Sequence, residues 1–232
     1  MNIKENIEIK DLALYLPKEK VLIISDTHIG MDEALNKEGV LVPRFGFKDL
    51  KKRLEIILKD LEINTIVING DLKHEFGIIS NTEWSQTLEL LEILENKCKD
   101  IILIRGNHDT ILGPIAKKKN LKPRDFYKVG DILITHGNKI INEDAKSIII
   151  GHEHPAVGLK EDSRVETYKC FLKGKFENKL LIVMPSFNLV TEGSNILRED
   201  ILSPYLDQDL SKFEVFIVGE DVYDFGRVED LE

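Results

Sequence analysis

Five short apolar runs, each followed directly by a polar motif, constrain the fold of this chain most strongly. The runs are Val21–Ile24, Thr65–Ile68, Ile101–Ile104, Ile132–Ile134 and Ile148–Ile150. They lack the apolar-polar alternation of a strand with one wet face, which is typical of strands covered on both faces. Two segments with helical spacing of apolar residues, Asp49–Glu62 and Glu83–Lys97, lie between the first three runs. This alternation of strands and helices predicts parallel pairing with right-handed crossovers.

The last third of the chain predicts a different arrangement. Antiparallel strands are expected over Tyr168–Leu172, Leu180–Met184, Val215–Val218 and Val222–Phe225. Gly174 and Gly219–Asp221 predict turns between them. Two long segments, Ile29–Phe47 and Ser186–Lys212, show little regular pattern, and such segments are often functional. We therefore predict an α/β (α+β) fold: a four-layer αββα sandwich of two mixed β-sheets flanked by helices, in a single domain over residues 1–232.

Composition and charge argue against several classes of protein. The hydrophobic content of 42% suffices for a core, and the net charge of -9 lacks the basic excess of a dedicated nucleic-acid binder, although a local basic groove would be compatible. Cys98 and Cys170 are too few for a disulfide framework and form no CxxC pair, which predicts a reducing, cytoplasmic location. We expect no membrane partner, because no apolar run reaches the roughly 20 residues that span a bilayer.

The motifs after the apolar runs contain five of the six histidines of the chain. They are Ser25-Asp26-Thr27-His28, Gly70-Asp71, Gly106-Asn107-His108-Asp109, Thr135-His136-Gly137 and Gly151-His152-Glu153-His154. In α/β sheets, ligands gather beyond the carboxyl ends of the parallel strands. In an extended segment residues i and i+2 point to the same side, so both members of Asp-x-His and of His-x-His can face one centre.

Seven side chains in these motifs are candidate metal ligands. They are Asp26, His28, Asp71, Asn107, His136, His152 and His154. Imidazole and oxygen donors without a thiolate favour manganese, iron, zinc, nickel or cobalt. Seven ligands are too many for one tetrahedral ion and suit two ions that share a carboxylate. Two metals roughly 3.5–4 Å apart can clamp the oxygens of a phosphoryl group and lower the pKa of a bound water, as phosphate ester hydrolysis requires.

The ordered set of five motifs, which extends from Asp26 to His154, resembles the calcineurin-like metallophosphoesterase superfamily. More closely, the segments Gly70–His74 and Gly151–Pro155 resemble an archaeal branch of that superfamily. This branch is related to the nuclease subunit of the SbcCD complex and is close to the bacterial DNA-ligase-associated phosphoesterases.

The resemblance implies a role for each motif residue. It implies that one metal is held by Asp26, His28, Asp71 and His154, and the other by Asp71, Asn107, His136 and His152. Asp71 would bridge the two ions, and a hydroxide between them would attack phosphorus in line. His108 would be the catalytic residue that protonates the leaving oxygen or steadies the transition state.

One position departs from the protein-phosphatase branch of the superfamily. That branch has an Asp three residues after the Gly-Asp carboxylate, where it orients the catalytic histidine, and this chain has His74 there. Asp109 or Glu75 could replace that carboxylate, or this chain could lack a carboxylate that orients His108. His74 is a candidate substrate contact, with a supporting or surface role as the alternative. Arg105 and Arg44 are also candidate substrate contacts, with a salt bridge and an ordinary loop arginine as their respective alternatives.

We therefore expect a phosphoric ester hydrolase with two divalent transition-metal ions. Manganese is the expected metal, with iron, zinc, nickel or cobalt as alternatives. The expected substrates are small nucleotide-like phosphomonoesters or phosphodiesters, and the alternative is a metal-dependent nuclease acting on DNA or RNA. A more remote alternative is a non-catalytic interaction scaffold, against which the presence of His108 argues. A homodimer is compatible with the sequence.

Overall fold

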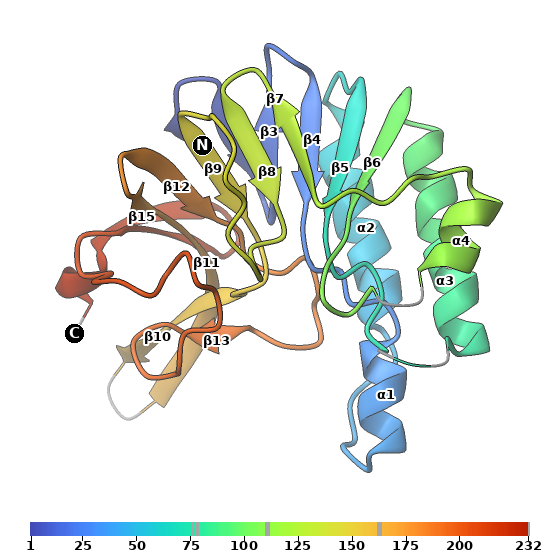
Figure 1. Ribbon diagram of the computed structural model, residues 1–232. Coiled ribbons are helices and arrows are strands. Elements are labelled where there is room, and N and C mark those ends of the chain that lie inside the picture. The colour runs from blue at the N-terminus through green and yellow to red at the C-terminus, as the bar shows by residue number, and fades with distance from the viewer. Residues whose placement is uncertain (76, 78, 110–111, 162–163, 232) are drawn as a thin grey trace.

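Two β-sheets pack face to face in the computed structural model, which describes residues 1–232 except 76, 78, 110–111, 162–163 and 232 (Figure 1). The first sheet has the strand order β1-β2-β3-β4-β5-β6. Its strands are β1 (Asn2–Lys4), β2 (Ile7–Lys10), β3 (Ala13–Leu16), β4 (Val21–Ile24), β5 (Thr65–Asn69) and β6 (Asp100–Ile104). The predicted parallel pairing of β4 with β5 and of β5 with β6 is confirmed. The first three strands were not predicted; they are short and pair antiparallel up to β4.

Helices cover the outer face of the first sheet (Figure 1). The helices of the described residues are α1 (Met31–Lys37), α2 (Gly46–Lys59), α3 (Asn81–Glu95) and α4 (Gly113–Lys118). Of these, α2 and α3 are the two predicted from helical spacing, and they bury leucines such as Leu54 and Leu90 against the sheet. Ser80 caps α3, because its Oγ accepts the backbone N–H of Glu83 at 3.1 Å.

The second sheet contains the remaining strands. They are β7 (Phe126–Val129), β8 (Ile132–Thr135), β9 (Ser147–Ile150), β10 (Pro155–Glu161), β11 (Arg164–Phe176), β12 (Lys179–Val183), β13 (Ser194–Asn195), β14 (Glu214–Val218) and β15 (Val222–Arg227). The order is β13-β10-β11-β12-β9-β8-β7, with β14 added on β11 and β15 on β14. The expected antiparallel pairing holds for β11, β14 and β15, whereas β12 is antiparallel to β11 but parallel to β9.

The sandwich of two mixed sheets is confirmed, and its two outer layers differ. All four described α-helices lie within residues 31–118, and the outer face of the second sheet is covered by the segment 196–213 and the short 3-10 helix Val228–Asp230. Tyr205 and Phe213 of that segment are buried on the sheet. The turn predicted at Gly174 is wrong: this glycine lies inside β11, where a Cβ would come within 2.5 Å of the Phe213 ring.

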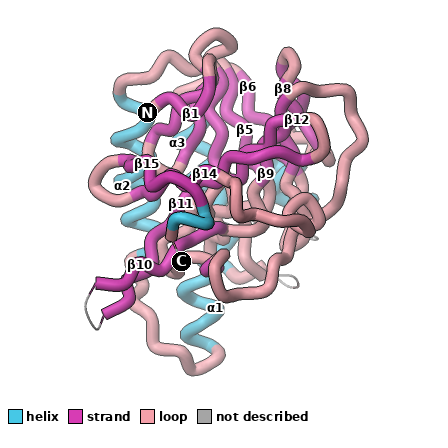
Figure 2. The backbone as a smooth tube through the Cα atoms, turned by 90° about the vertical axis from the view of Figure 1, so that its left-hand side faces the viewer, coloured by secondary structure: helices cyan, strands magenta, loops and turns pink. Residues whose placement is uncertain are grey.

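The carboxyl ends of β4, β5, β6, β8 and β9 meet at one edge of the sandwich, at the bottom of Figure 1. Helix α1 and the β10–β11 hairpin both project past this edge, in Figure 1 and in the rotated view of Figure 2. Among the described residues, no helix is long and apolar enough to cross a membrane. Cys98 and Cys170 are both free thiols.

Candidate metal centre

The edge where the strands end brings all seven predicted ligands together. Donor atoms of Asp26, His28 and His154 lie within 4.8 Å of one another, and so do those of Asp71, His136 and His152. The seventh residue, Asn107, joins the second group, because its Oδ1 is 2.9 Å from His136 Nε2. The two groups combine residues from both sheets, which explains why neither is visible as one sequence motif.

Asp71 lies between the two groups. Its Oδ2 is 3.7 Å from His28 Nε2 and 3.5 Å from His136 Nε2. Asp26 also contacts both groups, because its Oδ1 is 3.3 Å from His154 Nε2 and 3.5 Å from His136 Nδ1. The two donor groups are therefore contiguous and share a carboxylate.

The backbone that carries these side chains is strained. Ten described non-glycine residues have positive φ, and five of them are predicted ligands: Asp26, His28, Asp71, His152 and His154, at φ 54°, 40°, 44°, 65° and 50°. This is the left-handed region, which side chains other than glycine rarely adopt, and such strain clusters at functional sites. The expectation that the i and i+2 pairs converge through extended backbone is wrong, because left-handed turns direct them instead.

The glycines of the motifs are required by close packing. A Cβ on Gly106 would lie 2.0 Å from Asp71 Oδ1, and a Cβ on Gly151 would lie 2.3 Å from Asp26 Oδ2. Each carboxylate therefore rests directly on the backbone of a neighbouring motif. Further hydrogen bonds fix them: the N–H of His108 donates to Asp71 Oδ1 at 2.8 Å, and the N–H of His152 donates to Asp26 Oδ2 at 3.1 Å.

Burial shifts the pKa of the Asp71 carboxyl and the pKa values of the imidazoles in opposite directions. Burial, followed by the neighbouring Asp26 carboxylate, raises the pKa of Asp71 to about 8. Burial opposes ionisation of Asp26 as well, but the imidazole of His154 lowers the pKa of that carboxyl. Burial lowers the pKa of His28 and His136, so these rings are neutral and carry lone pairs at neutral pH.

Among the seven candidate ligands, Asp26 Oδ1 and His28 Nδ1 are buried without a hydrogen-bond partner. Buried polar atoms are normally paired, and an unpaired carboxylate oxygen beside neutral imidazoles is a suitable ligand for a cation. Both ring nitrogens of His136 face oxygens, since Nδ1 lies 3.3 Å from the Asn69 carbonyl and Nε2 lies 2.9 Å from Asn107 Oδ1. The Asn69 carbonyl can accept the proton of Nδ1, which would leave the lone pair of Nε2 for a metal ion. The donor set therefore fits a pair of divalent ions.

His108 lies beside the first donor group. Its ring meets that of His28 edge-on with 4.9 Å between the centroids. Its Nδ1 donates to the backbone carbonyl of His74 at 2.6 Å, and burial lowers its pKa. A carbonyl therefore takes the orienting role for which Asp109 and Glu75 were the candidates. Asp109 instead accepts the backbone N–H of Leu72, in the loop after Asp71, and the backbone N–H of Gly106.

His74 is also part of the centre. Its ring stacks on that of His108 with 5.4 Å between centroids, and donor atoms of His28, His74 and His108 lie within 4.8 Å of one another. The side chain is half-buried, and burial lowers its pKa. Its Nδ1 is buried without a hydrogen-bond partner. The structure thus excludes the surface position that was the alternative for this histidine.

The two arginines lie outside this cluster. Arg105 pairs with Asp125, with Nη1 3.1 Å from Oδ1, and its side chain is 52% exposed. The salt bridge considered as the alternative for Arg105 is therefore present. Arg44 is exposed in the turn that precedes α2.

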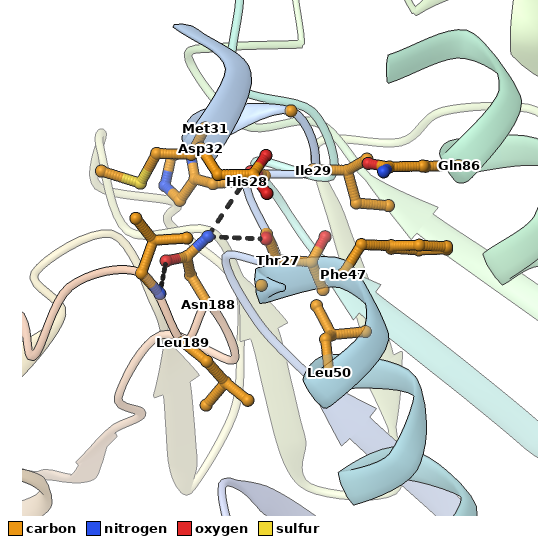
Figure 3. Close-up of a pocket in the computed structure, with 13 residues that line it drawn as sticks. Thr27, His28, Ile29, Met31, Asp32, Phe47, Leu50, Gln86, Asn188 and Leu189 are labelled. Atoms are coloured by element: carbon orange, nitrogen blue, oxygen red, sulfur yellow. Dashed lines mark hydrogen bonds between the residues drawn. The ribbon is translucent and has the colours of Figure 1, made fainter. Parts of the chain in front are cut away.

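Sequence reasoning missed three supporting residues. Lys73 and Glu83 are fully buried polar residues behind His74 and His108. Asn188 donates through Nδ2 to the carbonyls of Thr27 and, at 3.5 Å, of His28 (Figure 3). Asn188 lies in the long irregular segment after β12, and Lys73 lies in the segment Gly70–His74, but neither was identified as a supporting residue. The cavity that Asn188 lines behind His28 has about 10 Å³, room for one water.

Comparisons with known proteins agree with the sequence motifs. The chain matches the family model of the calcineurin-like phosphoesterases over residues 19–175. Among solved structures it is similar to the Pseudomonas putida nuclease MPE, with 19% identity over 93% of this chain and 92% of that chain and a TM-score of 0.68. It is also similar to Yfce, a phosphoesterase from E. coli, with 13% identity over 91% and 99% and a TM-score of 0.43. No curated protein matches significantly. The match over residues 19–175 shows that this chain belongs to the calcineurin-like phosphoesterase family.

Proposed function

We propose that this protein is a dinuclear-metal phosphoesterase that hydrolyses phosphomonoesters or phosphodiesters of small, nucleotide-like compounds. The observation that carries the proposal is the pair of donor groups that share Asp71, with His108 directly beside them. Family membership supports hydrolysis of phosphoesters as the class of reaction. The catalytic unit is one domain over residues 1–232, in a reducing cytoplasm compatible with two free thiols.

The residues present divide into two ligand sets. Asp26, His28 and His154 would hold one ion; Asn107, His136 and His152 would hold the other; and Asp71 would bind both. Manganese is the proposed metal, since all donors are imidazole nitrogens or oxygens. When bound, the two ions supply the Lewis acidity that activates water and neutralises charge on a phosphoryl group.

His108 provides the proton chemistry in this proposal. The hydrogen bond from Nδ1 to the His74 carbonyl places a proton on Nδ1 and directs Nε2 to proton exchange. In its doubly protonated form His108 would give the proton on Nε2 to the leaving oxygen and keep the proton on Nδ1, or it would donate a hydrogen bond from Nε2 to the phosphoryl group. His74, stacked on it, is a proposed contact for a phosphate oxygen.

The direct test combines metal analysis with hydrolysis. Purified protein is stripped of metal and reloaded with Mn²⁺, and its metal content and its turnover of p-nitrophenyl phosphate and bis(p-nitrophenyl) phosphate are measured. We expect two ions per chain and metal-dependent turnover, and we expect Asp71→Asn to lower occupancy of both ions. One ion per active chain would contradict the bridging role of Asp71. Full metal loading without turnover of either ester would favour the interaction scaffold.

A nuclease acting on DNA or RNA is the second candidate. The observation in its favour is the likeness to the fold of the Pseudomonas putida nuclease MPE, which at 19% identity covers 93% of this chain. The net charge of -9 argues against a dedicated nucleic-acid surface. Metal-dependent cleavage of end-labelled single-stranded DNA by the wild type, absent in Asp71→Asn, would select the nuclease.

A further inference from the structure

We propose that Glu83 is a positioning residue for His108 and acts through the backbone of His74; this inference rests on the proposed phosphoesterase function. Glu83 belongs to the first turn of α3 and is 0% exposed. Its Oε1 accepts the backbone N–H of His74 at 3.0 Å and that of Glu75 at 3.0 Å. The His74 N–H is shared with the Ile29 carbonyl, at 3.0 Å, whereas the Glu75 N–H, which belongs to the same peptide group as the His74 carbonyl, is held by Glu83.

The next contact leads from this peptide to His108. The carbonyl of His74 accepts the Nδ1–H of His108 at 2.6 Å. A backbone carbonyl orients a ring reliably only if its own peptide is held, because loop peptides otherwise rotate. The Oε1 atom of Glu83 provides that restraint from α3, because it accepts the Glu75 N–H of the same peptide group.

Lys73 holds the same segment from the other side. It is 0% exposed, and its Nζ donates to the backbone carbonyl of His108 at 2.8 Å and to that of Glu75. Lys73 and Glu83 are buried charges of opposite sign that attract each other across this segment. Together they hold residues 73–75 and the backbone of His108 in one hydrogen-bond network.

Glu83 itself is rigidly placed. Ser80 Oγ accepts its N–H at 3.1 Å at the start of α3. Gly30, two residues after His28, packs against its stem, and a Cβ there would lie 3.1 Å from Glu83 Cγ. The restraint therefore connects α3 to the loop after β4, which carries the first ligand motif.

Three variants separate the effect of side-chain length at position 83 from the effect of its charge. Glu83→Gln keeps an oxygen at the same reach without the charge, so we expect kcat near the wild-type value. Glu83→Asp keeps the charge but shortens the side chain, and Glu83→Ala removes the acceptor. For both we expect kcat on bis(p-nitrophenyl) phosphate to fall by roughly 10- to 100-fold, with unchanged KM and metal content. If Glu83→Ala does not fold, the Gln and Asp variants decide alone.

Glu33→Ala is the matched control. Glu33 accepts a hydrogen bond from Ser80 Oγ at 2.7 Å at the start of the same helix, and it does not bond the His74 or Glu75 amides. We expect its kcat to stay near the wild-type value. An equal loss in Glu33→Ala would indicate that any disturbance of this helix end suffices, and would overturn the proposal.

A double variant tests the route of the effect. If Glu83 acts through His108, adding Glu83→Ala to His108→Ala changes kcat by no more than about twofold, because the His108 ring that Glu83 would position is already absent. A full additional 10- to 100-fold loss would show that Glu83 acts elsewhere and would contradict the proposal.

A spectroscopic readout separates this inference from the proposed function. In the metal-free protein, ¹⁵N-edited NMR of the imidazoles reports which nitrogen of His108 carries the proton, whether or not the protein turns over any ester. We expect the Nδ1–H tautomer in wild type and Glu83→Gln and a mixture of tautomers in Glu83→Asp. An Nδ1–H tautomer retained in Glu83→Asp would refute the positioning role, whereas absence of wild-type turnover refutes only the phosphoesterase proposal.

Discussion

Replacement of Gly106 by alanine tests whether the candidate centre depends on contact between motifs. A Cβ at this position would lie 2.0 Å from Asp71 Oδ1 and 2.3 Å from the backbone nitrogen of Asp71. Rotation of the Asp71 side chain relieves the first contact but not the second. The two backbone segments must therefore separate by about 1 Å to reach ordinary van der Waals contact, which begins at 3.4 Å. The φ of Gly106 is not positive, so the effect is steric.

The expected magnitude follows from that displacement. A misplacement of about 1 Å in a catalytic constellation lowers activity by roughly 100-fold. Overpacking of a dense region costs about 1–3 kcal/mol of unfolding free energy. We therefore expect Gly106→Ala to lower kcat/KM for bis(p-nitrophenyl) phosphate by about two orders of magnitude and to weaken Mn²⁺ binding.

The assays are a Mn²⁺ titration of activity and denaturant unfolding with and without metal. Gly113→Ala is the control, since Gly113 begins α4 and a Cβ there meets nothing within 4 Å. The control should retain wild-type turnover and stability. Wild-type metal affinity and turnover in Gly106→Ala would refute the argument that Asp71 is held in place by the Gly106 backbone.

Three further substitutions test separate parts of the structure. His108→Ala should retain both metal ions, measured by elemental analysis, and lose roughly 10²- to 10⁴-fold in kcat, because it removes only proton chemistry; loss of metal would contradict this. Arg105→Ala should leave kcat/KM unchanged, because the side chain pairs with Asp125 at the surface; a large rise in KM would restore a substrate role. Burial lowers the pKa of Lys169 to about 8, whereas the unfolded value is near 10.5. The unfolded state then binds more protons between these values, so the unfolding free energy of wild type relative to Lys169→Met should rise from pH 8 to pH 10.5. Equilibrium unfolding at several pH values measures this difference, and a flat or falling difference would contradict it.

Much of the fold was predictable because its determinants are local. The runs at Val21–Ile24 and Thr65–Ile68 lack polar alternation, and burial on both faces is the physical reason. The helical spacing of α2 and α3 reflects their single apolar face. The first three strands were missed because they have only three or four residues, too few for a clear period. The layer outside the second sheet was missed because Tyr205 and Phe213 pack without regular structure.

The sequence by itself determined the donor atoms of the candidate centre and where they gather. Polar residues that follow parallel strands must meet at one edge, since parallel strands end on the same side. Tertiary structure alone decided how they are arranged. It places Asp26 of the first sheet beside His154 of the second, and it bends Asp26 and His154 into left-handed backbone. In the tertiary structure the backbone carbonyl of His74 orients the ring of His108, and Glu83 accepts the N–H of the same residue. Contacts between residues far apart in the chain produce no periodic pattern in the sequence. Every residue has a backbone carbonyl, so the sequence does not indicate which carbonyl orients a side chain.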